Sequence, residues 1–285
     1  MNRPGSSRLR RAVMQALGAP YRYFASRRRG LRAQYRRHVA TALAGPAGAT
    51  EALTERDLDH LPDAVARYVR RSGAVGLPRV TRFRATLRGR IRSSADGPWM
   101  AFLGEQVNTY GPHPTRLFLL DATMRGLPVD VLHVMAGGHA VMHVDLLSLV
   151  RVVDGSGPAM NQGETVTVFN DLCILAPGAL PFAPVTWETL DEHHVRGIFT
   201  AAGQTVTAIL EFSPDGDLVD FVSDDRLQAD ARGREFTPMR WSTPISGHRE
   251  LRGRRTATAA SAVWHAPEGA FTYAELEVTD LDTDP

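Results

Sequence analysis

Hydrophobic and polar residues alternate along most of the chain after residue 78, and this period of two predicts β-strands. Eleven such runs lie between turn residues, over 79–92, 99–110, 115–124, 127–135, 139–154, 194–201, 205–212, 218–227, 239–250, 256–266 and 270–281. The hairpin sequences AAGQ, SPDGD and APEGA favour antiparallel neighbours. A sheet of this many strands rarely stays flat and open. We therefore expect a mainly β (α+β) fold, a large curved antiparallel sheet or incomplete β-barrel with a few covering helices.

Helical periodicity marks three other segments. Residues 1–44 carry apolar residues every three or four positions, in the sets Leu9, Val13, Ala16, Leu17 and Leu31, Tyr35, Val39, Leu43. A short helix is expected from Pro62 to a stop at Gly73. The third helix is expected over residues 161–175, where Asn161 and Glu164 have the spacing of a capping box.

Charge separates the N-terminal segment from the remainder. Residues 1–50 carry eleven arginines and no acid, whereas residues 51–285 carry 22 arginines against 31 acids. We therefore expect a basic helical extension with a linker over residues 1–50 and a single half-barrel domain over residues 51–285. The basic segment could dock on the acidic remainder or bind an anionic membrane surface. No specific nucleic-acid binding is expected, and a cytoplasmic location, with membrane-peripheral binding as the alternative, is the default.

The stretch RFRATLRGRIR, residues 82–92, places five arginines on one face of a strand and apolar residues on the other. The arginines occupy even positions and Phe83, Leu87 and Ile91 occupy odd ones. Because the odd face suits a core, we expect the arginines on the convex side of the sheet. There they would pair with acids on adjacent strands, each exposed pair contributing about 0.2–1 kcal/mol.

Histidines and the single cysteine do not form a recognisable metal site. If Gly137 and Gly138 form a two-residue turn, His133 lies opposite Met142, on the other face from His139 and His143. Only a three-residue loop, which shifts the register by one, would bring the three histidines together as metal ligands. Cys173 falls on the apolar stripe of its helix and is expected in the core. No P-loop, G-x-G-x-x-G or H-E-x-x-H sequence occurs, so no metal and no cofactor are expected.

Carboxylates are the remaining candidates for chemistry. Glu105 is in phase with the apolar residues Trp99 and Leu103, so it would be an inward-facing charge that must find a partner. Glu164 is either an acid or base or the capping residue of its helix, and Asp171 is expected on the exposed side of that helix.

From LPDAVARYVRRSGAVGLPRV onward the chain resembles an uncharacterised, largely actinobacterial family, a domain of unknown function. The resemblance runs through RGRIR with PWMAFLGEQ, VVDGSGPAMNQGETV, APVTWETLD, DGDLVDF and WSTPISGHRELRG to AVWHAPEGAFTYAELEV, over residues 61–281. That family is distantly similar to the lipoprotein-carrier and mycobacterial lipoprotein superfamily. The resemblance implies an open, incomplete β-barrel wrapped over helices, and by analogy a hydrophobic ligand.

These observations favour a protein that binds an apolar or amphipathic small molecule in a half-barrel pocket. The expected pocket is lined by Phe83, Leu87, Trp99, Leu103, Trp187 and Trp241, with Glu105 and Gln106 as polar anchors. The alternatives are an enzyme that uses Glu105 or Glu164 as acid or base in that pocket, and a peripheral membrane or partner-docking protein acting through residues 1–44. Sequence gives neither the ligand nor the oligomeric state.

Overall fold

The computed structural model describes residues 30–45, 50–230 and 235–283. The strands are β1 (Arg82–Ile91), β2 (Met100–Thr109), β3 (Thr115–Met124), β4 (Leu127–Ala136), β5 (His139–Leu146), β6 (Val150–Ser156), β7 (Val185–Thr189), β8 (His194–Ala201), β9 (Gln204–Phe212), β10 (Leu218–Ser223), β11 (Leu227–Ala229), β12 (Phe236–Pro238), β13 (Trp241–Ser242), β14 (Ile245–Leu251), β15 (Arg254–Ala266) and β16 (Gly269–Asp282). The helices are α2 (Leu31–Ala42), α3 (Asp63–Arg71) and α4 (Pro158–Leu175), with short 3-10 helices η1 (Glu55–Leu58) and η2 (Pro177–Phe182).

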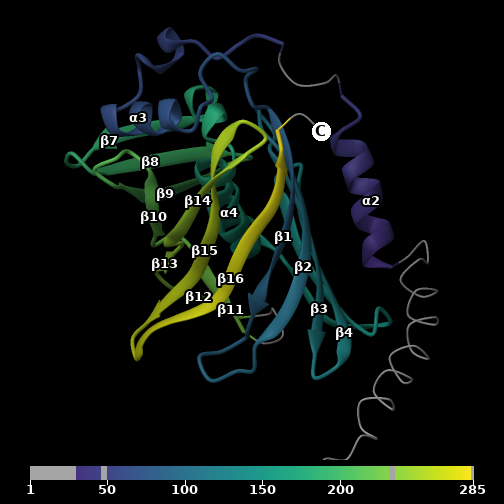
Figure 1. Ribbon diagram of the computed structural model, residues 1–285. Coiled ribbons are helices and arrows are strands. Elements are labelled where there is room, and N and C mark those ends of the chain that lie inside the picture. The colour runs from purple at the N-terminus through teal and green to yellow at the C-terminus, as the bar shows by residue number, and fades with distance from the viewer. Residues whose placement is uncertain (1–29, 46–49, 231–234, 284–285) are drawn as a thin grey trace, which may run out of the picture.

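Fourteen strands form one antiparallel sheet in the order β6-β5-β4-β3-β2-β1-β16-β15-β13-β10-β9-β8-β7, with β14 also paired to β15. Strands β1 to β6 form a meander of consecutive hairpins, and β16 joins that meander to the rest of the sheet. The sheet curls around α4, and α3 lies across one end (Figure 1). The mainly β, incomplete-barrel architecture expected from the sequence is confirmed.

Strand boundaries depart from the alternation pattern where turns are hidden in apolar sequence. The run expected over residues 139–154 is two strands, β5 and β6, because Leu147 and Ser148 adopt φ values of 56° and 54° and turn the chain. The run expected over residues 239–250 likewise divides into β13 and β14. Strand β7 and the small β11–β12 sheet were not predicted because they are short, five residues in β7 and three in each of β11 and β12.

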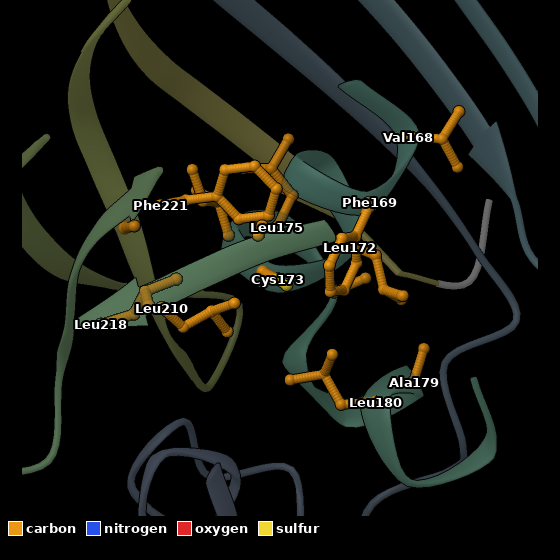
Figure 2. Packing of buried hydrophobic residues seen from close by; sticks show 14 of the residues in the cluster. Val168, Phe169, Leu172, Cys173, Leu175, Ala179, Leu180, Leu210, Leu218 and Phe221 are labelled. Carbon is orange, nitrogen blue, oxygen red and sulfur yellow. The ribbon is translucent and has the colours of Figure 1, made fainter. Parts of the chain in front are cut away.

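Helix α4 crosses the inside of the curled sheet and is buried on nearly every side. It begins at Pro158 after Gly157, whose φ of 102° suits glycine, so the capping box expected at Asn161 and Glu164 is wrong. Figure 2 shows Phe169 and Leu172 of α4 among Leu210 and Phe221 of the neighbouring strands. An interior helix of this kind is apolar around most of its circumference, which leaves its few charged residues in the core.

Helix α2 packs on the opposite, convex face of the sheet (Figure 1). Its Leu31 and Tyr35 are 1% and 4% exposed. They form a second, smaller hydrophobic cluster with Val107, Leu117, Leu119, Leu132 and Val134 of β2, β3 and β4. Arg32 adds an ion pair to Asp121. The apolar spacing of residues 31–43 is thus explained by docking on the sheet, whereas the stripe from Leu9 to Leu17 lies outside the described residues.

Three of the five arginines of residues 82–92, Arg84, Arg88 and Arg90, are exposed on the convex side as predicted. Arg82 is instead 8% exposed, and Arg92 donates to the backbone oxygens of Thr272 and Ala95. Arg88 and Arg90 stand directly opposite Glu277 and Glu275 of β16. The corresponding N–O distances are 2.7 and 2.6 Å. These pairs neutralise the arginine-rich surface locally. Within the described residues, no helix combines the length and apolarity needed to cross a bilayer.

Candidate functional site

A cavity of about 430 Å³ lies between α4 and the concave face of the sheet. Its lining includes Leu87 of β1, Phe102 of β2, Phe118 and Leu120 of β3, Met142 of β5 and Val278 of β16. The volume falls within the range of about 300–1,000 Å³ that is usual for small-molecule sites. The apolar wall makes this cavity suited to a hydrophobic group.

Small side chains on β15 keep part of the cavity open. The sequence TATAASA contributes Ala257, Ala260 and Ala262 to the wall, and Ala274 of β16 lies opposite Ala262. Larger residues at these positions would project into the space that α4 leaves free. The alanine run is therefore a sequence signal of the cavity, one that the alternation of apolar and polar residues does not reveal.

A buried polar network forms one part of the cavity wall, and we call Arg116, Glu164, Asp171, Gln106, Asn108 and His133 the Arg116 cluster. Arg116 of β3 donates from Nε to Asp171 Oδ2 at 2.7 Å and from Nη1 to Glu164 Oε2 at 3.0 Å. Gln106 and Asn108 of β2 also donate to Asp171 Oδ2, at 2.6 and 3.0 Å. The cluster links three strands to α4 through charge-assisted hydrogen bonds.

The electrostatics of the cluster favour its ionised form. Burial alone would oppose ionisation of Glu164, but the guanidinium of Arg116 and the neighbouring His133 outweigh it and hold the pKa of Glu164 well below its ordinary range. Burial likewise opposes the charge of Arg116, and the two carboxylates reverse that effect and raise its pKa. An ion-paired carboxylate of this kind is a poor proton donor near neutral pH. The geometry therefore disfavours Glu164 as a general acid.

His133 takes its orientation from the cluster. Its Nδ1 lies 3.2 Å from Glu164 Oε1. Because Glu164 is ionised and can only accept, Nδ1 carries a proton and donates it. In the neutral imidazole the second nitrogen, Nε2, then has a free lone pair. The predicted register of this hairpin is confirmed, since His133 stands opposite Met142 and the β4–β5 turn is Gly137–Gly138.

A second arginine, Arg226, reaches the cavity from the segment between β10 and β11. Its Nη1 donates to the carbonyl oxygen of Gly163 at 2.7 Å and to Thr167, so it is anchored to α4. Its guanidinium carbon lies 4.7 Å from the ring centroid of Trp241 and 5.8 Å from that of Trp264. Those two tryptophans face each other across β13 and β15.

Three of the residues expected to form the pocket line it, namely Leu87, Gln106 and Trp241. The expectations for Leu103 and Glu105 are wrong, because the odd face of β2 points outward and Leu103 is 66% exposed. Trp99 also lies outside, with the guanidinium groups of Arg90 and Arg92 stacked over it.

Two further aromatic residues are part of the core and not of the cavity wall. Phe83 is fully buried beside Tyr110, with ring centroids 6.2 Å apart. Trp187 of β7 packs against Phe169 behind α4, at 6.3 Å between centroids. The expectation that these two rings line the pocket is therefore wrong, since each packs between elements instead.

Helix α4 also corrects the expectation for Asp171, which is buried at 8% exposure and bound to Arg116 instead of facing solvent. Cys173 is fully buried in the core as predicted, and burial raises the pKa of its thiol. Among the described residues, no group of three or more His, Cys, Asp or Glu side chains is arranged to hold a metal ion.

Two solved structures resemble this chain at low sequence identity. A LolA superfamily protein from Nitrosomonas europaea covers 81% of this chain and 94% of its own length, at 10% identity and a TM-score of 0.42. A DUF1329 family protein from Desulfovibrio piger covers 76% of this chain and 90% of its own, at 13% identity and a TM-score of 0.41. No curated protein matches the chain. The model of a family of unknown function, DUF6544, matches residues 51–276, so the protein belongs to that family and the resemblance to an uncharacterised family is confirmed.

Proposed function

We propose that the half-barrel binds an amphipathic small molecule, with its apolar part in the cavity and a polar group against the charged residues of the wall. The observation that carries this proposal is the coexistence of an apolar cavity of about 430 Å³ with buried charged side chains facing it. Small-molecule sites typically combine a hydrophobic lining with a few polar groups that set the orientation of the ligand.

Rigid placement of the polar wall supports binding. Arg116 is held by two carboxylates, and Glu164 and Asp171 both belong to α4, which is fixed on the sheet. A ligand would therefore meet side chains that are already ordered, which lowers the entropic cost of association. Leu87 would contact its apolar part, whereas Gln106 and Trp241 lie beside the charged side chains of the wall, Arg116 and Arg226.

The test uses the full chain and the neutral fluorescent probe N-phenylnaphthylamine. Purified protein is first extracted with solvent, and native mass spectrometry before and after extraction reports any ligand that copurifies. We expect the extracted protein to bind the probe with enhanced emission. Absence of both a copurifying ligand and probe binding would refute the proposal.

A pair of matched variants locates the binding. Ala262 faces the cavity and is 4% exposed, whereas Ala101 is exposed on the convex face of β2. Ala262→Phe fills part of the cavity and should weaken probe binding about tenfold or more, while Ala101→Phe should leave it unchanged. Overpacking costs about 1–3 kcal/mol, so circular dichroism first verifies that both variants are folded. Equal probe affinity in the two folded variants would place the binding elsewhere.

A further inference from the structure

The geometry points to an anionic headgroup as the ligand's polar part, bound by Arg226 beside Trp241 and Tyr273 at the aromatic end of the cavity. This inference rests on the proposed function and names the class of ligand: a molecule with one negatively charged oxygen-bearing group, a carboxylate or a phosphate, on an apolar chain.

Arg226 has hydrogen-bonding capacity that the described part of the chain does not use. Arginine carries five N–H donors, and only Nη1 of Arg226 finds acceptors, both of them uncharged. The Nε atom is buried and has no hydrogen-bond partner. The charge of Arg226 helps to lower the pKa of Glu164, but no carboxylate among the described residues lies close enough to form an ion pair with this guanidinium. A buried donor without an acceptor is uncommon in native structures and indicates a missing partner.

The unused side of Arg226 is the one that this protein elsewhere pairs with carboxylates. Arg240, Arg252 and Arg255 each donate from Nε and Nη2 to the two oxygens of one aspartate. Arg90 does the same with Glu275. In Arg226 the anchor to α4 through Nη1 leaves this Nε–Nη2 side without an acceptor among the described residues. A carboxylate or phosphate has the spacing of oxygens that such a pairing needs.

A second donor lies close to the same place. Tyr273 lines the cavity, and its hydroxyl oxygen accepts a hydrogen bond from Trp241 Nε1 at 3.1 Å. The hydroxyl proton has no acceptor among the described residues, so it can be donated to a ligand. Because Arg226 also contacts the Trp241 ring, the two free donors flank one indole. Both side chains are partly buried, and burial strengthens a charged hydrogen bond.

The carboxylates of the cavity do not offer an equivalent site for a cation. Asp171 Oδ2 accepts from three donors, and Glu164 accepts from Arg116 and His133. Their negative charges are thus already compensated by direct hydrogen bonds, whereas Arg226 donates only to neutral acceptors. This difference in pairing predicts selectivity for anions over cations.

The experiment compares ligands of one chain length by displacement of N-phenylnaphthylamine from the full chain. Dodecanoate and dodecyl phosphate should compete about tenfold or more tightly than dodecanol, and dodecyltrimethylammonium should be weakest. A preference between the two anions identifies the source of the charge as carboxylate or phosphate. In Arg226→Gln the preference for dodecanoate over dodecanol should fall to within about threefold. The matched control is Arg240→Gln, which removes an arginine paired to Asp224 on the surface and should keep the selectivity.

The outcomes separate this inference from the proposed function. Equal competition by dodecanol and dodecanoate, or tightest binding of the ammonium compound, would overturn the anionic headgroup while leaving the apolar site standing. Failure of every ligand and of the probe itself would refute the proposed function. If Arg226→Gln does not fold, the ligand series on the unaltered protein still decides. Tyr273→Phe provides a milder variant, which should weaken binding of dodecanoate more than binding of dodecanol.

Discussion

Replacing Arg116 by methionine removes the only charged donor shared by Glu164 and Asp171 among the described residues while keeping a side chain of similar length. The side chains of Arg116 and Glu164 are 6% and 3% exposed, and that of Asp171 is 11% exposed. Removing one partner of a buried ion pair typically costs about 3–5 kcal/mol, because the other charge stays buried without compensation. Gln106, Asn108 and His133 retain their hydrogen bonds to the carboxylates, so we expect a cost at the lower end of that range, about 3 kcal/mol.

The cost should depend on pH in a defined direction. In the unaltered protein the folded pKa of Glu164 lies below its ordinary value of 4.5. Its contribution to stability is therefore present above about pH 4.5 and is lost as the pH falls. In Arg116→Met, burial would raise the folded pKa instead, and stability would fall as the pH rises through that value. The difference between the two proteins should thus be smaller at pH 4 than at pH 7.

Urea unfolding followed by tryptophan fluorescence measures this difference, with the slope of unfolding free energy against urea as the check on two-state behaviour. The control is Arg88→Met, which breaks the exposed pair with Glu277 and should cost no more than about 1 kcal/mol at any pH. The triple change Arg116→Met, Glu164→Gln, Asp171→Asn removes all three charges and should recover much of the loss. A cost for Arg116→Met below about 1 kcal/mol, or one independent of pH, would refute this account of the Arg116 cluster.

Two further predictions test other parts of the fold. Burial raises the pKa of Asp220 from 3.8 to about 6, which means that the folded protein favours the protonated carboxyl. The stability gained from this protonated form is complete below about pH 4 and is lost as the pH rises through 6. Asp220→Asn should therefore stabilise the protein at pH 8 by about 1–2 kcal/mol, a value reduced for the partial exposure of the side chain, and should have no effect at pH 4. Thermal unfolding at both pH values measures the two effects. A gain in stability at pH 4 would contradict the prediction. Tyr35→Ala should detach α2 without unfolding the sheet, because Tyr35 is in the cluster that joins them. Hydrogen exchange should then rise in residues 31–42 and stay unchanged in β9, and protection retained in α2 would contradict the docking.

The alternation of residues was sufficient for the sheet because most strands have one face in the core and one in solvent. The outward side chains of Arg88 and Arg90 follow from that rule, and the register of the β4–β5 hairpin follows from its two-residue turn at Gly137 and Gly138. The alternation rule failed on β2, because α2 covers the outer face of this strand and the Arg116 cluster occupies its inner face. There the inward residues Gln106 and Asn108 are polar and the outward Val107 is buried, which reverses the usual pattern.

Arg116 itself could not be found from spacing. It is the second residue of β3, and both faces of that strand are apolar because helices lie on both sides of the sheet. Its partners are 48 and 55 residues away on α4. Only the path of the chain brings them together, and one sequence does not record that path. Glu164 was identified as a candidate by its residue type, but its role as an ion-pair partner required the position of α4.

The place of β16 in the sheet orders the assembly of the fold during synthesis. This strand follows every other described strand in the chain, yet it pairs with β1 on one side and β15 on the other. Arg84 therefore meets Asp282 only after nearly two hundred residues of intervening chain have been made. Until then the meander of β1 to β6 has an open edge at β1, and open strand edges are sites of aggregation. A chain truncated before β16 would leave the two parts of the sheet unjoined, with open edges at β1 and β15.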